Sequence, residues 1–262
     1  MALFWQKLLL ALTALLMQPT CSSAPLLLSI NMTAQDRQFL ITNNQKIAIV
    51  MPYPASDDTS VVVALVLQPI ANLTQVAFEA TPVLYLAYAP VGLFDTIKIA
   101  LQSPAAYGQA YSFDGARING EGTGVPGYVS LYYNAPKAGG ASVITGLAGY
   151  VYDVATGKQA QPSPLNHYLL NRYETRLIPA TRPVAWVFVS TDVNIGSVLP
   201  MAALKPVSPS TTTRSGDHAL AGKQAPPLQI GRYLPVQLDA SEQTNIYFDI
   251  GANAFSYAAP TQ

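Results

Sequence analysis

Apolar and polar residues alternate with a period of two along several segments of the chain. Residues 96–102 and 245–250 place Ile, Leu or Phe at every second position and mostly polar residues between them, which predicts strands with one buried face. Other segments are apolar on both faces, as is typical of strands covered by a second layer. These are residues 46–51, 61–67, 83–88 and 183–189.

Proline and glycine interrupt the chain at short intervals that are rich in β-branched and aromatic residues. This spacing predicts further strands separated by turns. They span residues 74–79, 110–118, 127–134, 142–153 and 234–238. The total is about ten strands.

One helix is expected, over residues 163–176. Ser163 suits an N-cap and Pro164 the first helical position, and the apolar residues that follow recur at helical spacing as far as Arg176. Strand runs with a single helix predict an all-β fold, an antiparallel β-sandwich, whose jelly-roll or immunoglobulin-like topology the pattern leaves open.

The amino end has the pattern of a secretory signal peptide over residues 1–23. Lys7 precedes a ten-residue apolar run, and small residues surround a cleavage site after Ser23. We therefore expect a secreted protein, or a periplasmic or cell-surface one in a bacterium. Cys21 lies where a bacterial lipoprotein carries its lipid, but the residues before it do not fit that processing, which disfavours lipidation.

We expect residues 24–262 to form one β-sandwich domain. Residues 205–227 interrupt it with four prolines and a Ser/Thr cluster, which predicts a mobile surface excursion. No later apolar run is long enough to predict a transmembrane segment. With a single cysteine, the chain is expected to be free of disulfides.

The charge pattern argues against nucleic acid as a partner. The chain has 14 Lys+Arg and 14 Asp+Glu, and no two basic residues are adjacent. Proteins that bind nucleic acid neutralise phosphates with clustered basic residues, which this chain lacks. Half of the residues are hydrophobic, which is enough to bury a core.

Most catalytic chemistries lack the residues they need. The two histidines, His167 and His218, have no metal-ligand spacing, so no metal site and no cofactor are expected. The glycines of residues 120–124 precede a predicted strand and not a helix, which disfavours a phosphate-binding loop. An extracellular glycoside hydrolase remains an alternative, with Asp114 and Glu121 as its carboxylate pair, although both adjoin glycines and also suit turns.

Tyrosines are unusually dense between residues 107 and 152. An exposed group of them offers apolar area with a hydroxyl handle, which favours binding of carbohydrate or of a protein surface, self-association included. The candidate ligand-binding residues are Tyr107, Tyr111, Tyr132, Tyr150 and Tyr152. The alternative interpretation is that tyrosine is simply a favoured strand residue beside the core.

Two sequons, at Asn31 and Asn72, are acceptors for N-glycosylation if the source is eukaryotic. No motif is specific enough to indicate a family. The hypothesis that demands least of the residues present is a secreted, non-enzymatic binding or structural protein. A membrane-active, pore-forming toxin-like protein is the second alternative beside the hydrolase, because the chain combines low charge with many tyrosines and alternating strands.

Overall fold

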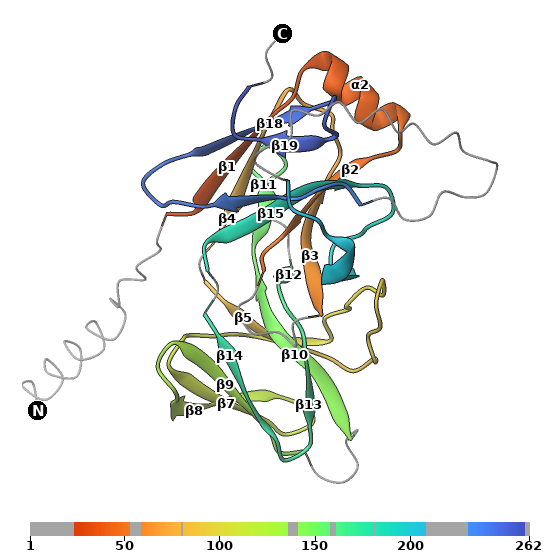
Figure 1. Cartoon of the computed structure of the whole chain (residues 1–262). Helices are drawn as coiled ribbons and strands as arrows, with labels where there is room; N and C mark the ends of the chain where they lie inside the picture. The colour runs from red at the N-terminus through yellow and green to blue at the C-terminus, as the bar shows by residue number, and fades with distance from the viewer. Residues whose placement is uncertain are drawn as a thin grey trace, which may run out of the picture.

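A computed structural model describes residues 24–52, 59–79, 81–135, 141–157, 161–180, 182–207 and 230–259. The predicted signal peptide with Cys21, His218 and most of the 205–227 excursion lie outside the described residues. The described part of the chain is mostly strand, arranged in several packed sheets (Figure 1), which confirms the all-β fold class. Its extent as one domain stays a prediction.

Two five-stranded sheets form the AB sandwich, which occupies the upper half of Figure 1. Sheet A has the order β11 (Val151–Asp153), β4 (Leu73–Phe78), β1 (Leu26–Asn31), β18 (Thr244–Asp249), β19 (Ala254–Ser256). Sheet B has the order β16 (Val198–Pro200), β3 (Ser60–Leu67), β2 (Lys46–Val50), β15 (Val184–Ser190), β17 (Leu234–Gln237). A short 3-10 helix, η1 (Met201–Ala203), follows β16.

Two smaller sheets form the CD sandwich in the lower half of Figure 1. Sheet C has the order β12 (Ser163–Pro164), β10 (Ser142–Gly149), β5 (Val83–Ala87), β6 (Leu101–Pro104), and β13 (Tyr168–Asn171) also pairs with β10. Sheet D has the order β14 (Thr175–Pro179), β9 (Tyr128–Tyr133), β7 (Gln109–Phe113), β8 (Ile118–Thr123). The named strands pair antiparallel, except for β1 with β18 and β7 with β9, which are parallel.

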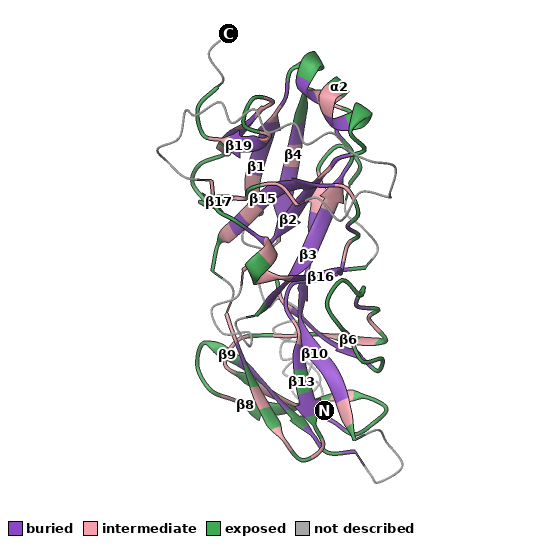
Figure 2. Ribbon diagram, turned by 45° about the vertical axis from the view of Figure 1, so that its right-hand side comes forward, coloured by how far each residue is buried: buried purple, intermediate pink, exposed green. Residues whose placement is uncertain are grey.

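Each sandwich encloses its own hydrophobic core, and a third cluster joins them. Inward-facing residues of sheets A and B, such as Ile246 and Phe248, form the larger core, while those of sheets C and D, such as Leu131 and Leu147, form the second. Val62 of β3 packs with residues of β5 and β10 in the joining cluster. In Figure 2 both β3 and β10 are coloured mostly as buried.

Buried hydrogen bonds join β5 and β10 of sheet C to Asn166, near the place where the two sandwiches meet. The Tyr85 hydroxyl donates to the Asn166 carbonyl at 2.5 Å, and the Leu147 amide donates to Asn166 Oδ1 at 2.7 Å. Burial raises the pKa of Tyr85 far above its ordinary value. Gly146 lies against the same group, where a Cβ would come within 2.4 Å of the Asn166 carbonyl oxygen.

The predicted helix over residues 163–176 is wrong, because that segment forms β12, β13 and β14. Burial alternates along β13: Tyr168 and Leu170 are buried, and Leu169 between them is exposed. Tyr173, with φ of 63°, turns the chain into β14. The apolar residues that fit helical spacing thus lie in a strand whose burial alternates with a period of two. The segment is a strand because β10 supplies backbone hydrogen-bond partners for β13.

The single α-helix among the described residues is α2 (Ala34–Thr42). It begins at Thr33, whose hydroxyl accepts a hydrogen bond from the Asp36 amide, while the Asp36 carboxylate accepts the Thr33 amide at 2.7 Å. No helix of the described residues is long and apolar enough to cross a membrane. The glycine-rich residues 120–124, which suit a loop between strands, instead lie mostly in β8.

Candidate functional site

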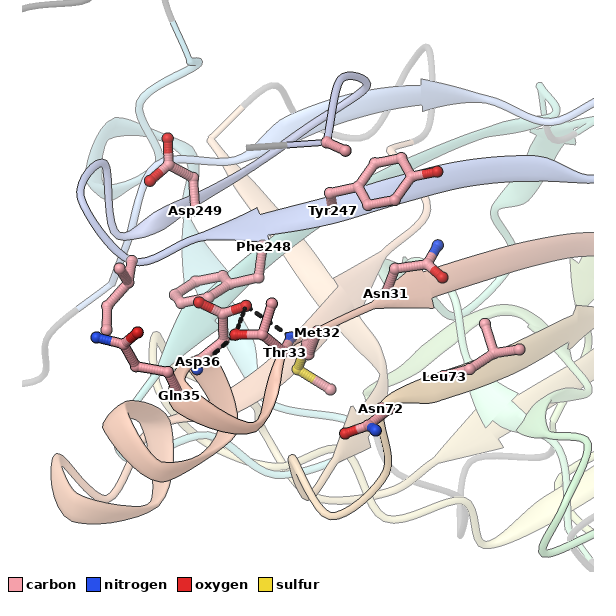
Figure 3. A pocket seen from close by; sticks show the side chains of 12 residues that line it. Asn31, Met32, Thr33, Gln35, Asp36, Asn72, Leu73, Tyr247, Phe248 and Asp249 are labelled. Carbon is pink, nitrogen blue, oxygen red and sulfur yellow. Dashed lines mark hydrogen bonds between the residues drawn. The ribbon is translucent and has the colours of Figure 1, made fainter. Parts of the chain in front are cut away.

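A cavity of about 530 Å³ opens at the end of sheet A where β1 leads into α2 (Figure 3). Its volume lies within the range of small-molecule sites, about 300–1,000 Å³. Three stretches far apart in the sequence supply its walls. The lining residues are Asn31, Met32, Thr33, Gln35, Asp36, Asn72, Leu73, Tyr247, Phe248, Asp249, Ile250 and Ala259.

Strand pairing brings the central lining residues into one row. Leu73 of β4 is the register partner of Asn31 in β1, and Asn31 is in turn the partner of Tyr247 in β18. Side chains in register share a face, so all three belong to the outer face of sheet A, opposite the core residue Phe248. The Asn31 side-chain amide donates to the Ile246 carbonyl at 3.2 Å, which leaves the amide oxygen as an acceptor.

The two carboxylates of the cavity bond the protein's own backbone. Asp36 accepts the amide and the hydroxyl of Thr33 in the capping box of α2. Asp249 Oδ1 accepts the amides of Gly251 and Ala252, at 2.8 and 3.3 Å, in the turn that leads to β19. These acids shape the ends of α2 and β18, and we assign them a structural role.

The lining suits a neutral polar ligand. It offers side-chain amides and hydroxyls beside an aromatic ring, and its described residues include no Lys or Arg. Asn and Gln supply both donors and acceptors, as a ligand rich in hydroxyls requires. In the described part of the chain, no group of three or more His, Cys, Asp or Glu residues could hold a metal ion.

The structure does not bring the five predicted tyrosines together. Tyr107 and Tyr111 are half-buried against the core of the CD sandwich, and the Tyr111 hydroxyl accepts the Ala106 amide at 3.0 Å. Tyr132 belongs to β9 of sheet D and is exposed.

The other two candidate tyrosines lie near the junction of the sandwiches. Tyr150 packs against the joining cluster. Tyr152 belongs to β11 of sheet A, and its hydroxyl donates to Glu79 at 3.3 Å. The five side chains therefore belong to four separate surroundings and form no common platform.

The candidate carboxylate pair sits on the β7–β8 hairpin. Asp114 accepts the amides of Ala116 and Arg117, both at 2.8 Å, and the side-chain amide of Asn119. The two backbone hydrogen bonds, followed by the one from Asn119, lower the pKa of Asp114. Glu121 accepts the Ser112 hydroxyl, and both acids are exposed. Asp114 thus stabilises the turn of the hairpin through its carboxylate.

The two sequon asparagines, in contrast, do come together. The Met32 amide donates to the Asn72 carbonyl at 2.8 Å, and both Asn31 and Asn72 line the cavity. Asn72 is exposed, whereas Asn31 is half-buried. Sequence reasoning missed the cavity itself. The alternation of residues 245–250 places Tyr247 and Asp249 on the polar face, but nothing in the pattern shows that β1 is their neighbour.

Comparison with protein-family models, with curated proteins and with solved structures found no match. The functional interpretation therefore rests on the residues and their geometry.

Proposed function

We propose that this is an exported, non-enzymatic binding protein that holds a neutral, hydroxyl-rich ligand of the carbohydrate class in the cavity on sheet A. The observation that carries the proposal is the row formed by Leu73, Asn31 and Tyr247. It places an apolar side chain, an amide and an aromatic hydroxyl in register across three strands.

Each feature of the row matches a feature of a sugar. The ring of Tyr247 offers a surface for the apolar face of a pyranose, and its hydroxyl can bond a ring substituent. The Asn31 oxygen accepts a hydroxyl, while the Gln35 and Asn72 amides, on the wall of the same cavity, supply both donors and acceptors.

Charge also favours a neutral ligand over an ionic one. An anionic ligand needs a cation or a group of backbone amides, and no Lys or Arg is among the lining residues that the structure describes. The two carboxylates hold backbone amides, so a cation would have to compete with the cap of α2 and the turn after β18.

Binding of the purified protein to a glycan array tests the proposal, followed by titration calorimetry with the best ligand. Tyr247→Ala removes the half-buried ring from the cavity, and we expect it to weaken binding by about tenfold or more, the usual loss for a buried aromatic anchor. Tyr132→Ala is the matched control, because it deletes a tyrosine from the exposed surface of sheet D.

A blank array would contradict the proposal. So would binding that Tyr247→Ala leaves intact. Loss of binding in Tyr132→Ala but not in Tyr247→Ala would instead move the site to the tyrosines of sheet D.

A further inference from the structure

A second cavity, of about 430 Å³, lies between the chain around η1 and the turn that joins β18 to β19. Two basic residues line it: Lys205, which follows η1, and Arg232, which precedes β17. Asn253, in the β18–β19 turn, belongs to the same lining, and no Asp or Glu is among the lining residues that the structure describes. We call this cavity the basic hollow, because its charge is positive where that of the sheet A cavity is not.

Backbone pairing places the two basic residues side by side. Pro206 and Tyr233 form a parallel β-bridge. The Tyr233 amide donates to the Lys205 carbonyl, and the Val207 amide donates to the Tyr233 carbonyl, both at 2.9 Å. In a parallel pair the residues one position before the bridge are neighbours as well, so Lys205 lies beside Arg232 on segments about 5 Å apart.

Both basic side chains lie on the side of this pair that faces away from the core. Tyr233 packs inward, where its ring stacks on Trp186 with 4.2 Å between the ring centroids. Because side chains alternate along an extended segment, Arg232 lies on the opposite side, and the pairing places Lys205 on that side too. Both are exposed, and neither forms an ion pair or a side-chain hydrogen bond with another residue of the described ranges.

This arrangement is unfavourable for the protein on its own. Like charges on paired neighbours repel each other. Asp249, the acid of the nearby β18–β19 turn, does not line the hollow, and its carboxylate accepts the amides of Gly251 and Ala252. An anion in the basic hollow would remove the repulsion and bond both basic side chains.

Asn253 adds a hydrogen-bond donor to the hollow. Its side-chain oxygen is buried and has no hydrogen-bond partner among the described residues, so the amide nitrogen is the end left to face the hollow. The walls are held by the backbone: the Gly231 amide donates to the Val189 carbonyl at 2.8 Å, and the Asn253 amide donates to the Ile250 carbonyl at 3.4 Å. The site is thus organised before a ligand arrives, which lowers the entropy cost of binding.

We propose that the basic hollow binds a phosphate dianion, either free phosphate or the phosphate group of a small ester. Two adjacent basic side chains and an amide donor match several charged oxygens on one centre, and hydrogen bonds between charged groups are stronger than neutral ones. A phosphate group carries close to two negative charges at neutral pH. The volume of the hollow lies within the range of small-molecule sites, which leaves room for the organic part of an ester.

An NMR titration of the purified protein with inorganic phosphate, at neutral pH and low ionic strength, tests the proposal. The amide resonances of Gly231 and Ala252, which line the hollow, should shift to saturation with a Kd on the order of a millimolar or lower. Sodium chloride at about 150 mM should weaken binding severalfold, because the Debye length is then about 8 Å.

A second titration, with ribose phosphate, separates the two sources of the phosphate group. Tighter binding than that of inorganic phosphate identifies an ester as the ligand, and equal or weaker binding identifies free phosphate. Ribose alone should leave both amide resonances unchanged.

Substitutions test the assigned residues. Arg232→Gln and Lys205→Gln each remove one charge from an exposed side chain, so both variants should fold, and each should weaken phosphate binding by about tenfold. Asn253→Gly removes the amide at a position with φ of 46°, which glycine adopts readily, and should weaken binding by a smaller factor. Arg182→Gln is the matched control, because Arg182 is also exposed but does not line the hollow, and it should leave the Kd unchanged.

The inference is overturned if neither inorganic phosphate nor ribose phosphate shifts the amide resonances of the hollow. It is also overturned if binding occurs but Arg232→Gln and Lys205→Gln leave the Kd unchanged, as Arg182→Gln does. Asp217 is the single acid of residues 208–229, which connect the two basic segments. Phosphate binding that appears only in Asp217→Asn would overturn the inference by showing that the protein's own carboxylate neutralises the pair. None of these outcomes bears on the cavity of sheet A, with which the hollow shares no described lining residue.

Discussion

Replacing Gly146 by alanine should destabilise the protein strongly, because its surroundings in β10 leave no room for a methyl group. The new Cβ would lie 2.4 Å from the Asn166 carbonyl oxygen, 2.5 Å from Asn166 Oδ1 and 2.9 Å from a ring carbon of Tyr85. Real Cβ atoms do not approach neighbours this closely, so Asn166 or β10 must move.

The expected cost combines crowding with lost hydrogen bonds. Overpacking a core costs about 1–3 kcal/mol. Displacing Asn166 also weakens the bonds from the Tyr85 hydroxyl and the Leu147 amide, and each buried polar group left unpaired costs about 1–3 kcal/mol. Since the two bonds need not break completely, we expect a total of about 3–5 kcal/mol and a fall in Tm of roughly 10 °C.

Urea unfolding followed by far-ultraviolet circular dichroism measures this change. Gly120→Ala is the control, because a Cβ at Gly120 in β8 meets nothing within 4 Å. It should alter the free energy of unfolding by no more than about 0.5 kcal/mol. A Gly146→Ala variant as stable as the Gly120→Ala variant would refute the conclusion that Asn166 is packed tightly against Gly146.

Three further predictions concern local interactions. Tyr85→Phe removes the hydrogen bond to Asn166 and should cost about 1–3 kcal/mol in urea unfolding, and ultraviolet titration of the folded protein should show Tyr85 still protonated where exposed tyrosines ionise. Thr33→Ala breaks the capping box with Asp36 and should cost about 1 kcal/mol, whereas full stability would show that the cap contributes nothing. The pKa of Asp114 is lowered, so its hydrogen bonds stabilise the hairpin above pH 3.8, and this stabilisation is lost as the pH falls through the pKa of Asp114 in the folded protein. An NMR titration in which the Asp114 carboxyl titrates at or above 3.8 would contradict this.

Most strands buried on one or both faces could be predicted from the sequence, because burial leaves a local pattern; the strand predicted over residues 96–102 is wrong except at its end, because only Leu101 and Gln102 belong to β6. Residues 61–67 and 245–250 match β3 and β18 closely. β1 has no such signal, because it begins with three consecutive leucines and not with alternating apolar and polar residues. Its partner β18 lies more than 200 residues away in the sequence. Its strand state comes from pairing, which local propensity cannot reveal.

The two helix errors have complementary causes. The segment that contains Tyr168 and Leu169 satisfies helical spacing by coincidence, and pairing with β10 decides its conformation. The true helix, α2, has almost no apolar face, since Asp36 and Leu40 are its only buried residues. Its one sequence signal is the spacing of Thr33 and Asp36, a capping box with Asp in place of the usual Glu or Gln.

The candidate site was beyond prediction for a related reason. Asn31, Leu73 and Tyr247 belong to three strands whose order in sheet A no local pattern encodes. The sequence pattern did mark Asn31 and Asn72 as sequons, but their adjacency comes from the register of β1 with β4. The predicted tyrosines failed to converge because residues close in sequence alternate between the faces of different sheets.

The parallel pairing of β1 with β18 has a consequence for biogenesis. Synthesis proceeds from the amino end, so β1 can pair with β4 early, but its second partner, β18, is made only after more than 200 further residues. Until then the middle of that sheet has an unsatisfied edge, and contacts so distant in sequence form slowly. Completion of sheet A therefore waits until synthesis of the chain has passed β18.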